Sequence, residues 1–324
     1  MKKKIVIIGA GQLGSRHLQS LAVLDQNNFE IFVFDTQLSS LEVAKQRYLE
    51  VSKENSPYIE ISTNFESLPQ DLFFVIVATG SMVRKSVVEN LLKHSNIQYL
   101  ILEKFLFPKK EDYTVIGELL DKNAVKTFVN TPRRTFDFYR AIGEKLNFPF
   151  QMEVVGSQWG LGCNAIHFLD LFYFLNQNTP FQVISNIDKE VISSKREGYV
   201  EFTGSFNIND DRNNTCQIVS YNEGNLPIVI TITDSNGKKI IHEGLGELLN
   251  FSSKDGKYEY RKEVIRMPFQ SESTSKIVLE LLSTGTCKIT PYQDSAYLHL
   301  ILLEKYLHQY SQFLNQNVEI CPIT

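Results

Sequence analysis

Residues 4–14 of the chain read KIVIIGAGQLG. The apolar, mostly β-branched run 5–8 is typical of a short buried strand. Gly9 then permits a tight turn, Gly11 lets the backbone approach a pyrophosphate, and Gly14 lets the following helix pack closely on the strand. That helix would direct free N–H groups and its positive dipole end toward the phosphate. The stretch therefore predicts a dinucleotide-binding turn.

An acidic residue after the second strand strengthens this prediction. Asp35 ends the apolar run 31–34 and lies about 20 residues beyond Gly14, which is the spacing of a carboxylate that binds an adenine ribose. Glycine patterns alone also occur in ordinary strand-to-helix turns, so the flanking strand, helix and acid are what favour a dinucleotide. A carboxylate repels a 2′-phosphate, and no arginine follows Asp35 closely. We therefore expect NAD in preference to NADP.

Composition excludes several classes of protein. The length of 324 residues suggests two domains, and the net charge of −4 gives no electrostatic basis for binding nucleic acid or an anionic membrane. No apolar run approaches the length of a membrane span. The four cysteines lie far apart, and the six histidines lack metal-ligand spacing. We expect a cytoplasmic protein that holds no metal.

Strand and helix patterns alternate through residues 1–129. Further strands are expected at 31–34, 58–62, 72–77, 99–102 and 125–129, with helices at 38–51, 83–94 and 112–122. Such alternation is typical of an α/β fold with a doubly wound parallel (Rossmann) sheet, which binds ligands at the carboxyl ends of its strands.

The pattern changes at residue 130, so residues 130–324 are expected to form an α+β domain with a mainly antiparallel sheet. Helices are expected at 131–146, 165–175, 273–282 and 295–314, and strands at 151–159, 181–186, 199–207, 215–221, 228–233, 239–243 and 257–265. The pair Asn236-Gly237 is a hairpin signal.

Glu103 and Lys104 directly follow the strand 99–102, at a position that faces the ligand crevice of an open α/β sheet. A lysine at this position can bind substrate hydroxyls and transfer a proton. The alternative is a surface salt bridge at the end of a strand.

Polar residues also interrupt an apolar helical stretch. Asn164, His167 and Asp170 are spaced three apart, so a helix places them in one stripe. His167 is either a proton shuttle or a core histidine satisfied by Asp170, which in both cases orients it. Arg133 and Arg134 can bind a substrate phosphate or carboxylate, or can be solvated on a helix surface.

Taken in order, these residues resemble one family. The glycine turn with Ser15-Arg16-His17, Thr79 after the strand 72–77, Glu103-Lys104, Asn130 with its two arginines, and His167-Phe168-Leu169-Asp170 are similar to motifs of the glucose–fructose oxidoreductase / inositol dehydrogenase (Gfo/Idh/MocA) family. The resemblance covers essentially the whole chain. It implies an NAD(P)-dependent oxidoreductase acting on a sugar, cyclitol or nucleotide sugar. It also implies a homo-oligomer, dimer or tetramer, that forms through the C-terminal sheet.

The resemblance assigns roles to residues. It implies that Lys104 and His167 are catalytic, and that cofactor is bound by Gly9, Gly11, Gln12, Leu13, Gly14, Asp35, Thr79 and Glu103. Substrate contacts are expected from Arg134, Asn164 and Asp170. Two positions depart from the family, because Phe105 replaces a proline and Cys163 replaces an aspartate that commonly precedes the histidine. A thiol cannot replace a carboxylate in proton transfer unless it ionises.

Three hypotheses follow. In the preferred one, Lys104 and His167 flank the carbinol carbon of a sugar while hydride moves to or from NAD. The Cys163-Asn164 pair also resembles variants from cell-surface polysaccharide pathways. In the second, the protein binds NAD without catalysis, having lost the aspartate. In the third, transient oxidation enables an elimination. Net NADH formation from sugars is expected only in the first.

Overall fold

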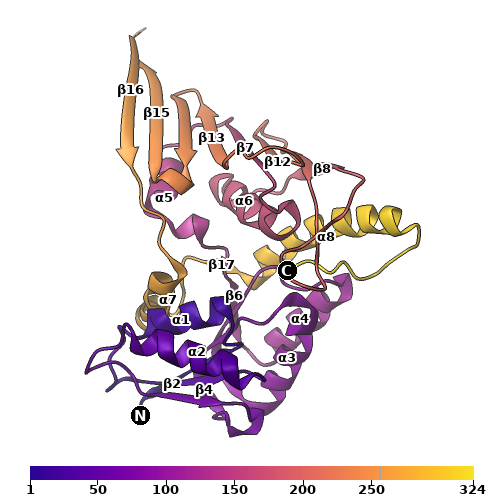
Figure 1. The fold of residues 1–324 in the computed structure, drawn as a ribbon. Helices are drawn as coiled ribbons and strands as arrows, with labels where there is room; N and C mark the ends of the chain where they lie inside the picture. The colour runs from indigo at the N-terminus through magenta and orange to yellow at the C-terminus, as the bar shows by residue number, and fades with distance from the viewer. Residues whose placement is uncertain (255–256) are drawn as a thin grey trace. The chain divides into compact units, whose positions relative to one another are not determined.

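The computed structural model describes residues 1–254 and 257–324 (Figure 1). Contacts divide the chain into two units, one of Met1–Asn130 with Pro268–Ala296 and one of Thr131–Met267 with Tyr297–Thr324. The first unit contains a mainly parallel sheet and the second a mainly antiparallel sheet. The predicted fold class is confirmed.

The sheet of the first unit has seven strands in the order β17-β6-β5-β4-β1-β2-β3. Strands β1 to β6 are parallel, and β17 is antiparallel to β6. Their bounds are β1 (Lys3–Ile8), β2 (Phe29–Phe34), β3 (Ile59–Ser62), β4 (Asp71–Val77), β5 (Asn96–Leu102), β6 (Lys126–Val129) and β17 (Thr290–Pro291). The strand order reverses between β1 and β4, and ligands of such sheets bind outside the carboxyl ends of the strands at this point.

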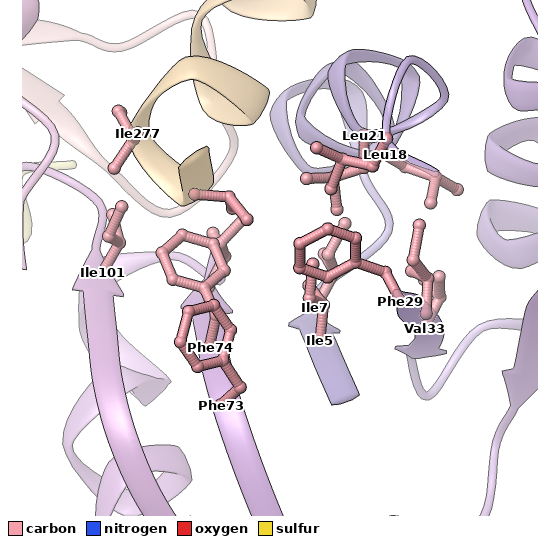
Figure 2. Packing of buried hydrophobic residues seen from close by; sticks show 14 of the residues in the cluster. Ile5, Ile7, Leu18, Leu21, Phe29, Val33, Phe73, Phe74, Ile101 and Ile277 are labelled. Carbon is pink, nitrogen blue, oxygen red and sulfur yellow. The ribbon is translucent and has the colours of Figure 1, made fainter. Parts of the chain in front are cut away.

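Helices cover the faces of this sheet. They are α1 (Gln12–Leu21), α2 (Leu38–Leu49), α3 (Ser81–His94), α4 (Lys110–Lys122) and α7 (Gln270–Thr284), with the 3₁₀ helix η1 (Phe65–Ser67). Leu18 and Leu21 of α1 and Ile277 of α7 are buried in one cluster with Ile7 and Phe74 of the sheet (Figure 2). Helices α1 and α7 therefore share one core with the strands.

Helix α7 comes late in the sequence, yet it packs with the first unit. The sequence pattern placed all of residues 130–324 in the second domain, whereas contacts group Pro268–Ala296 with the first unit. The apolar side of α7, with Ile277, Val278 and Leu281, is buried in the α1 cluster. Periodicity shows that a helix has an apolar face, but not which sheet that face covers.

The sheet of the second unit has eight strands in the order β16-β15-β14-β13-β7-β12-β11-β8. Its neighbouring strands are antiparallel except β7 and β12, which are parallel. The bounds are β7 (Gln151–Ser157), β8 (Gln182–Ile187), β11 (Gly204–Asn209), β12 (Thr215–Tyr221), β13 (Val229–Asp234), β14 (Gly237–His242), β15 (Glu247–Lys254) and β16 (Lys257–Val264). A separate short pair joins β9 (Ile192–Ser193) and β10 (Val200–Glu201).

The helices of this unit are α5 (Asp137–Glu144), α6 (Leu161–Leu175) and, from Tyr297 onward, α8 (Tyr292–Leu314). Two 3₁₀ helices, η2 (Pro132–Thr135) and η3 (Glu243–Leu245), accompany them. Helix α6 packs against β12 and η2. Its side chains are mostly buried, and the ring of Phe172 lies 5.6 Å from that of Phe150 at the start of the sheet. This helix positions the polar stripe discussed below.

Most expected elements are present with slightly different ends, but three expectations were wrong. The helix predicted for 131–146 is divided into η2 and α5 by the extended residue Phe136 (φ −72°, ψ 130°). The strand predicted for 199–207 is divided into β10 and β11, and Gly204 at the start of β11 has φ +114°. The predicted pattern also lacked β15, which pairs with β14 and β16, and the two-residue strands β9 and β17.

Candidate active site

The glycine turn of the first unit is closely packed on one side and open on the other. Gly9 has φ +94°, and a Cβ atom at Gly14 would lie 1.8 Å from the carbonyl oxygen of Gly9, so only glycine fits there. A Cβ atom at Gly11 would meet nothing within 4 Å. No side chain caps the start of α1, and its first turn contains no acidic residue. The positive end of this helix is thus available to a ligand phosphate.

Asp35 lies beside this turn. Its Oδ2 accepts a hydrogen bond from the backbone N–H of Ala10 at 2.7 Å, and its Oδ1 accepts one from the N–H of Gln37 at 2.8 Å. Each carboxylate oxygen can accept a second bond, which suits the diol of a ribose. The turn, the helix end and Asp35 together fit a dinucleotide.

An arginine that the sequence analysis did not consider reaches the same helix. Arg47, in the last turn of α2, donates to the hydroxyl of Ser15 at 2.6 Å and to the side-chain oxygen of Gln12 at 3.0 Å. A cation can therefore lie near the start of α1 without following Asp35 closely in the sequence. The preference for NAD over NADP stays a prediction.

Glu103 belongs to a buried polar network at the end of β5. Its Oε1 lies 2.8 Å from Nε2 of His17 and accepts a bond from the side-chain amide of Asn130 at 2.6 Å. His17 contacts the hydroxyl of Thr274 through Nδ1 at 2.8 Å. The network joins α1, β5, the end of β6 and α7. Glu103 is thus fixed at the end of β5, and the partly exposed Lys104 directly follows it.

In the second unit a cavity of about 530 Å³ lies at the start of α6. Six of its lining residues are Trp159, Cys163, Asn164, Lys195, Glu201 and Asn222. The indole of Trp159 donates to the carbonyl of Val219 at 2.8 Å, which fixes the ring at the cavity wall. The side-chain amide of Asn164 donates to the carbonyl of Trp159 at 2.8 Å. The volume lies within the range of small-molecule sites, about 300–1,000 Å³.

The first turns of α6 present a polar face. Cys163, Asn164 and His167 are partly exposed, whereas Asp170 is completely buried. Asn164 and His167 of the predicted stripe therefore lie on one partly exposed face of the helix, whereas Asp170 is buried in the core. Cys163, at the position where the sequence resemblance implies an aspartate, lines the cavity with Asn164.

The carboxylate of Glu201 occupies the amino end of α6. Its Oε1 accepts bonds from the N–H groups of Gly162 and Phe202, and its Oε2 accepts one from the N–H of Cys163 at 3.3 Å. This cap satisfies N–H groups that a helix start leaves unpaired. The position of Glu201 could not be predicted from the sequence, because only the fold brings this residue to the helix.

Asp170 and Arg134 pair with each other. The guanidinium donates to Oδ1 at 2.7 Å and to Oδ2 at 3.0 Å, and both side chains are buried. Arg134 is therefore not solvated on a helix surface, as one interpretation of the sequence had it. The pair holds η2 against α6, and its expected role in binding substrate stays a prediction.

Arg133 is also engaged within the second unit. It donates to both carboxylate oxygens of Glu243 at 2.9 and 2.7 Å, and its guanidinium lies 4.3 Å from the ring centre of Phe168. Tyr139 donates to the same glutamate at 2.8 Å. Burial, with the adjacent charge of Glu243, raises the pKa of Tyr139 well above its usual value. This cluster has a structural role.

Comparison with known proteins identifies the first unit. The model of the Gfo/Idh/MocA family, described as an oxidoreductase family with an NAD-binding Rossmann fold, matches residues 3–131. This part of the chain belongs to that family. The resemblance expected from the sequence motifs is confirmed there. The sequence matches no curated protein.

Solved structures share the fold of the whole chain. A super-repressor mutant of Gal80p from Saccharomyces cerevisiae is 13% identical, with a TM-score of 0.71 and 98% of both chains covered. A biliverdin reductase from Synechocystis, bound to biliverdin and NADP⁺, is 12% identical (TM-score 0.71; 93% of this chain and 98% of that one). A myo-inositol dehydrogenase from Lactobacillus casei, bound to NAD(H) and myo-inositol, is 16% identical (TM-score 0.68; 96% and 95%). At these identities the likeness establishes the fold.

The described residues lack the features of two other kinds of site. In the two ranges 1–254 and 257–324, no helix has the length and apolarity to cross a membrane. The same residues contain no group of three or more His, Cys, Asp or Glu side chains arranged to hold a metal ion.

The open side of the glycine turn makes a test of cofactor binding possible. We expect Gly11→Ala to fold normally, since the new Cβ atom meets nothing, but to weaken NAD⁺ binding at least about tenfold because it projects where the pyrophosphate approaches. Calorimetry measures the affinity and thermal unfolding the stability. Gly244→Ala, whose Cβ atom also has open space, is the control. Unchanged affinity in Gly11→Ala, or no heat from wild type with NAD⁺ and NADH, would contradict the assignment.

The buried pair of Arg134 and Asp170 generates a prediction on stability. Arg134→Met and Asp170→Leu should each lower the free energy of unfolding by about 3–5 kcal/mol, because each leaves an uncompensated buried charge. The double variant should lose less than the sum of the two, which urea unfolding of all three variants measures. Additive losses would show that the two side chains do not depend on each other.

Proposed function

We propose that this protein is an NAD-dependent oxidoreductase that moves hydride to or from a carbinol carbon of a sugar, cyclitol or nucleotide sugar. The observation that carries the proposal is the open cradle of the first unit. Gly11 leaves space at the uncapped start of α1, and Asp35 is held beside it. Lys104 lies just after the end of β5 in the same parallel sheet. The family match to residues 3–131 supports the same chemistry.

The chain's residues divide the work between binding and proton transfer. When bound, the nicotinamide accepts or supplies the hydride. The glycine turn binds the diphosphate and Asp35 the adenine ribose. Lys104 takes the hydroxyl proton as the carbinol is oxidised to a carbonyl, and returns it in the reverse direction. His167 is the second candidate for proton transfer.

The cavity of the second unit supports a hydroxylated substrate. Around the half-buried ring of Trp159 it presents the amide groups of Asn164 and Asn222. A fixed aromatic face with surrounding hydrogen-bonding groups suits a sugar ring, which has both apolar C–H faces and hydroxyls. The dehydrogenase from L. casei, with myo-inositol and NAD(H), is a relative in fold with such a ligand.

A ligand-binding protein without catalysis is the second candidate. The observation that favours it is Cys163, which lines the cavity where the family commonly has a carboxylate. A cell-surface polysaccharide pathway is the setting suggested by the Cys163-Asn164 pair. Both candidates require NAD and ligand binding, so they differ only in whether NADH forms.

Replacement of Lys104 tests the catalytic proposal. Lys104→Met should bind NAD⁺ as wild type does, but lower turnover about 10²- to 10⁴-fold, because the proton acceptor is gone. Free sugars, cyclitols and nucleotide sugars are supplied with NAD⁺, and NADH is measured by its absorbance. Lys110→Met, at an exposed lysine on α4, is the matched control. Unimpaired turnover in Lys104→Met would remove this residue from the mechanism.

The outer face of the eight-stranded sheet supports a homo-oligomer. Val154, Ile218 and Ile230 are completely buried on the inner face. On the outer face Val155 pairs in register with Val219 and Val229, and these three side chains are half-buried. On the same face of the neighbouring strands Ile240 pairs in register with Leu249, in the row that contains Thr231 and Glu153. We propose that two copies of the chain pack these faces together.

Light scattering tests this interface. Wild type should have the mass of a dimer or larger assembly, and Val229→Arg should shift the mass toward a monomer because it introduces a charge into the apolar face. Val115→Arg, at an exposed apolar residue of α4, should leave the mass unchanged. A monomeric wild type at high protein concentration contradicts the proposal.

A further inference from the structure

The largest completely buried side chain of the first unit is a cation. Arg84, on α3, is 1% exposed. A guanidinium removed from water is costly unless its N–H groups are bonded. Its Nη1 donates to the carbonyls of Phe105 and Leu106, the latter at 2.7 Å, and its Nη2 donates to the carbonyl of Thr79. These acceptors are backbone carbonyls, so the side chain of Arg84 holds the backbone of the segments to which they belong.

The three carbonyls belong to two segments that border the crevice. Thr79 follows β4, and Phe105 with Leu106 directly follows Lys104 after β5. The glycine turn rests on the first of these segments, since a Cβ atom at Gly9 would lie 3.1 Å from the backbone nitrogen of Thr79. One planar guanidinium therefore fixes the spacing between the support of the cofactor turn and the segment that carries Lys104.

The segment after Lys104 is also anchored from α4. The hydroxyl of Tyr113 donates to the carbonyl of Phe107 at 2.9 Å, and it accepts a bond from the N–H of Phe107 at 3.3 Å. Phe105, Leu106 and Phe107 are completely buried. Lys104 thus leads into a short segment whose backbone is held on both sides. The side chain of Arg84 also connects it to the segment after β4.

We propose that Arg84 is a positioning residue for Lys104. It sets the lysine against the bound nicotinamide through the carbonyls of Thr79, Phe105 and Leu106. This inference rests on the proposed role of Lys104 in proton transfer. The rigid fork of arginine bonds all three carbonyls at once, whereas the single ammonium of a lysine is a point donor. The geometry of the fork, rather than the charge alone, is what the site needs.

Steady-state kinetics of Arg84→Lys and Arg84→Gln test the proposal. We expect Arg84→Gln to lower kcat about 100-fold, the effect of a displacement of about 1 Å at a reacting group, with KM for NAD⁺ and sugar within about threefold of wild type. Arg84→Lys should recover part of this loss. The control is Lys93→Met, at an exposed lysine of the same helix. Wild-type kcat in both Arg84 variants overturns the proposal.

A second measurement does not depend on turnover. Lysines of each variant are dimethylated with ¹³C, and the resonance of Lys104 is assigned by its absence in Lys104→Met. The Lys104 resonance should shift in both Arg84 variants; Arg84→Lys keeps a buried cation, so it remains testable if Arg84→Gln does not fold. The resonance should not shift in Lys93→Met. An unchanged Lys104 resonance contradicts positioning. If wild type produces no NADH with any sugar while this shift is present, the proposed function fails and the positioning by Arg84 stands.

Discussion

Buried carboxylates determine the geometry of both candidate sites. A carboxylate removed from water must find donors, and the donors here come from distant parts of the sequence. Glu103 joins β5 to α1 and to the end of β6. Glu201 of β10 caps the start of α6, and Asp170 of α6 binds Arg134 of η2. Because each carboxylate joins separate elements, the positions of Lys104 and of the α6 polar face follow from contacts that do not themselves react.

The amino ends of α1 and α6 differ in whether their N–H groups are available to an anion. At α1 no side chain takes the first N–H groups, and its opening turn has no acid, so an anion can bind there. At α6 the carboxylate of Glu201 already accepts the N–H groups of Gly162 and Cys163. The cavity beside α6 therefore lacks this source of anion affinity. The contrast agrees with a diphosphate in the first unit and hydroxyl groups in the second.

Local sequence signals predicted the parallel sheet well, because buried β-branched runs and glycine turns have short-range causes. The same holds for the turn at Gly9, for Asp35 beside it, and for α6. Partners that lie far apart in the sequence could not be predicted. Spacing cannot show that Arg84 bonds the segment after Lys104, or that Glu201 accepts the N–H groups at the start of α6. Two consecutive arginines could likewise be interpreted as substrate ligands or as solvated side chains, and the sequence did not show that Arg134 is buried and pairs with Asp170.

The late return of the chain to the first unit affects its synthesis. His17 meets the hydroxyl of Thr274, and Leu18 shares its cluster with Ile277. A ribosome that has released only residues up to Asn130 has therefore made a sheet with part of its apolar covering missing. The second unit, most of which lies between the two parts of the first, emerges before α7 does. The first unit is thus begun first, but it is completed only after residues 268–296 have emerged.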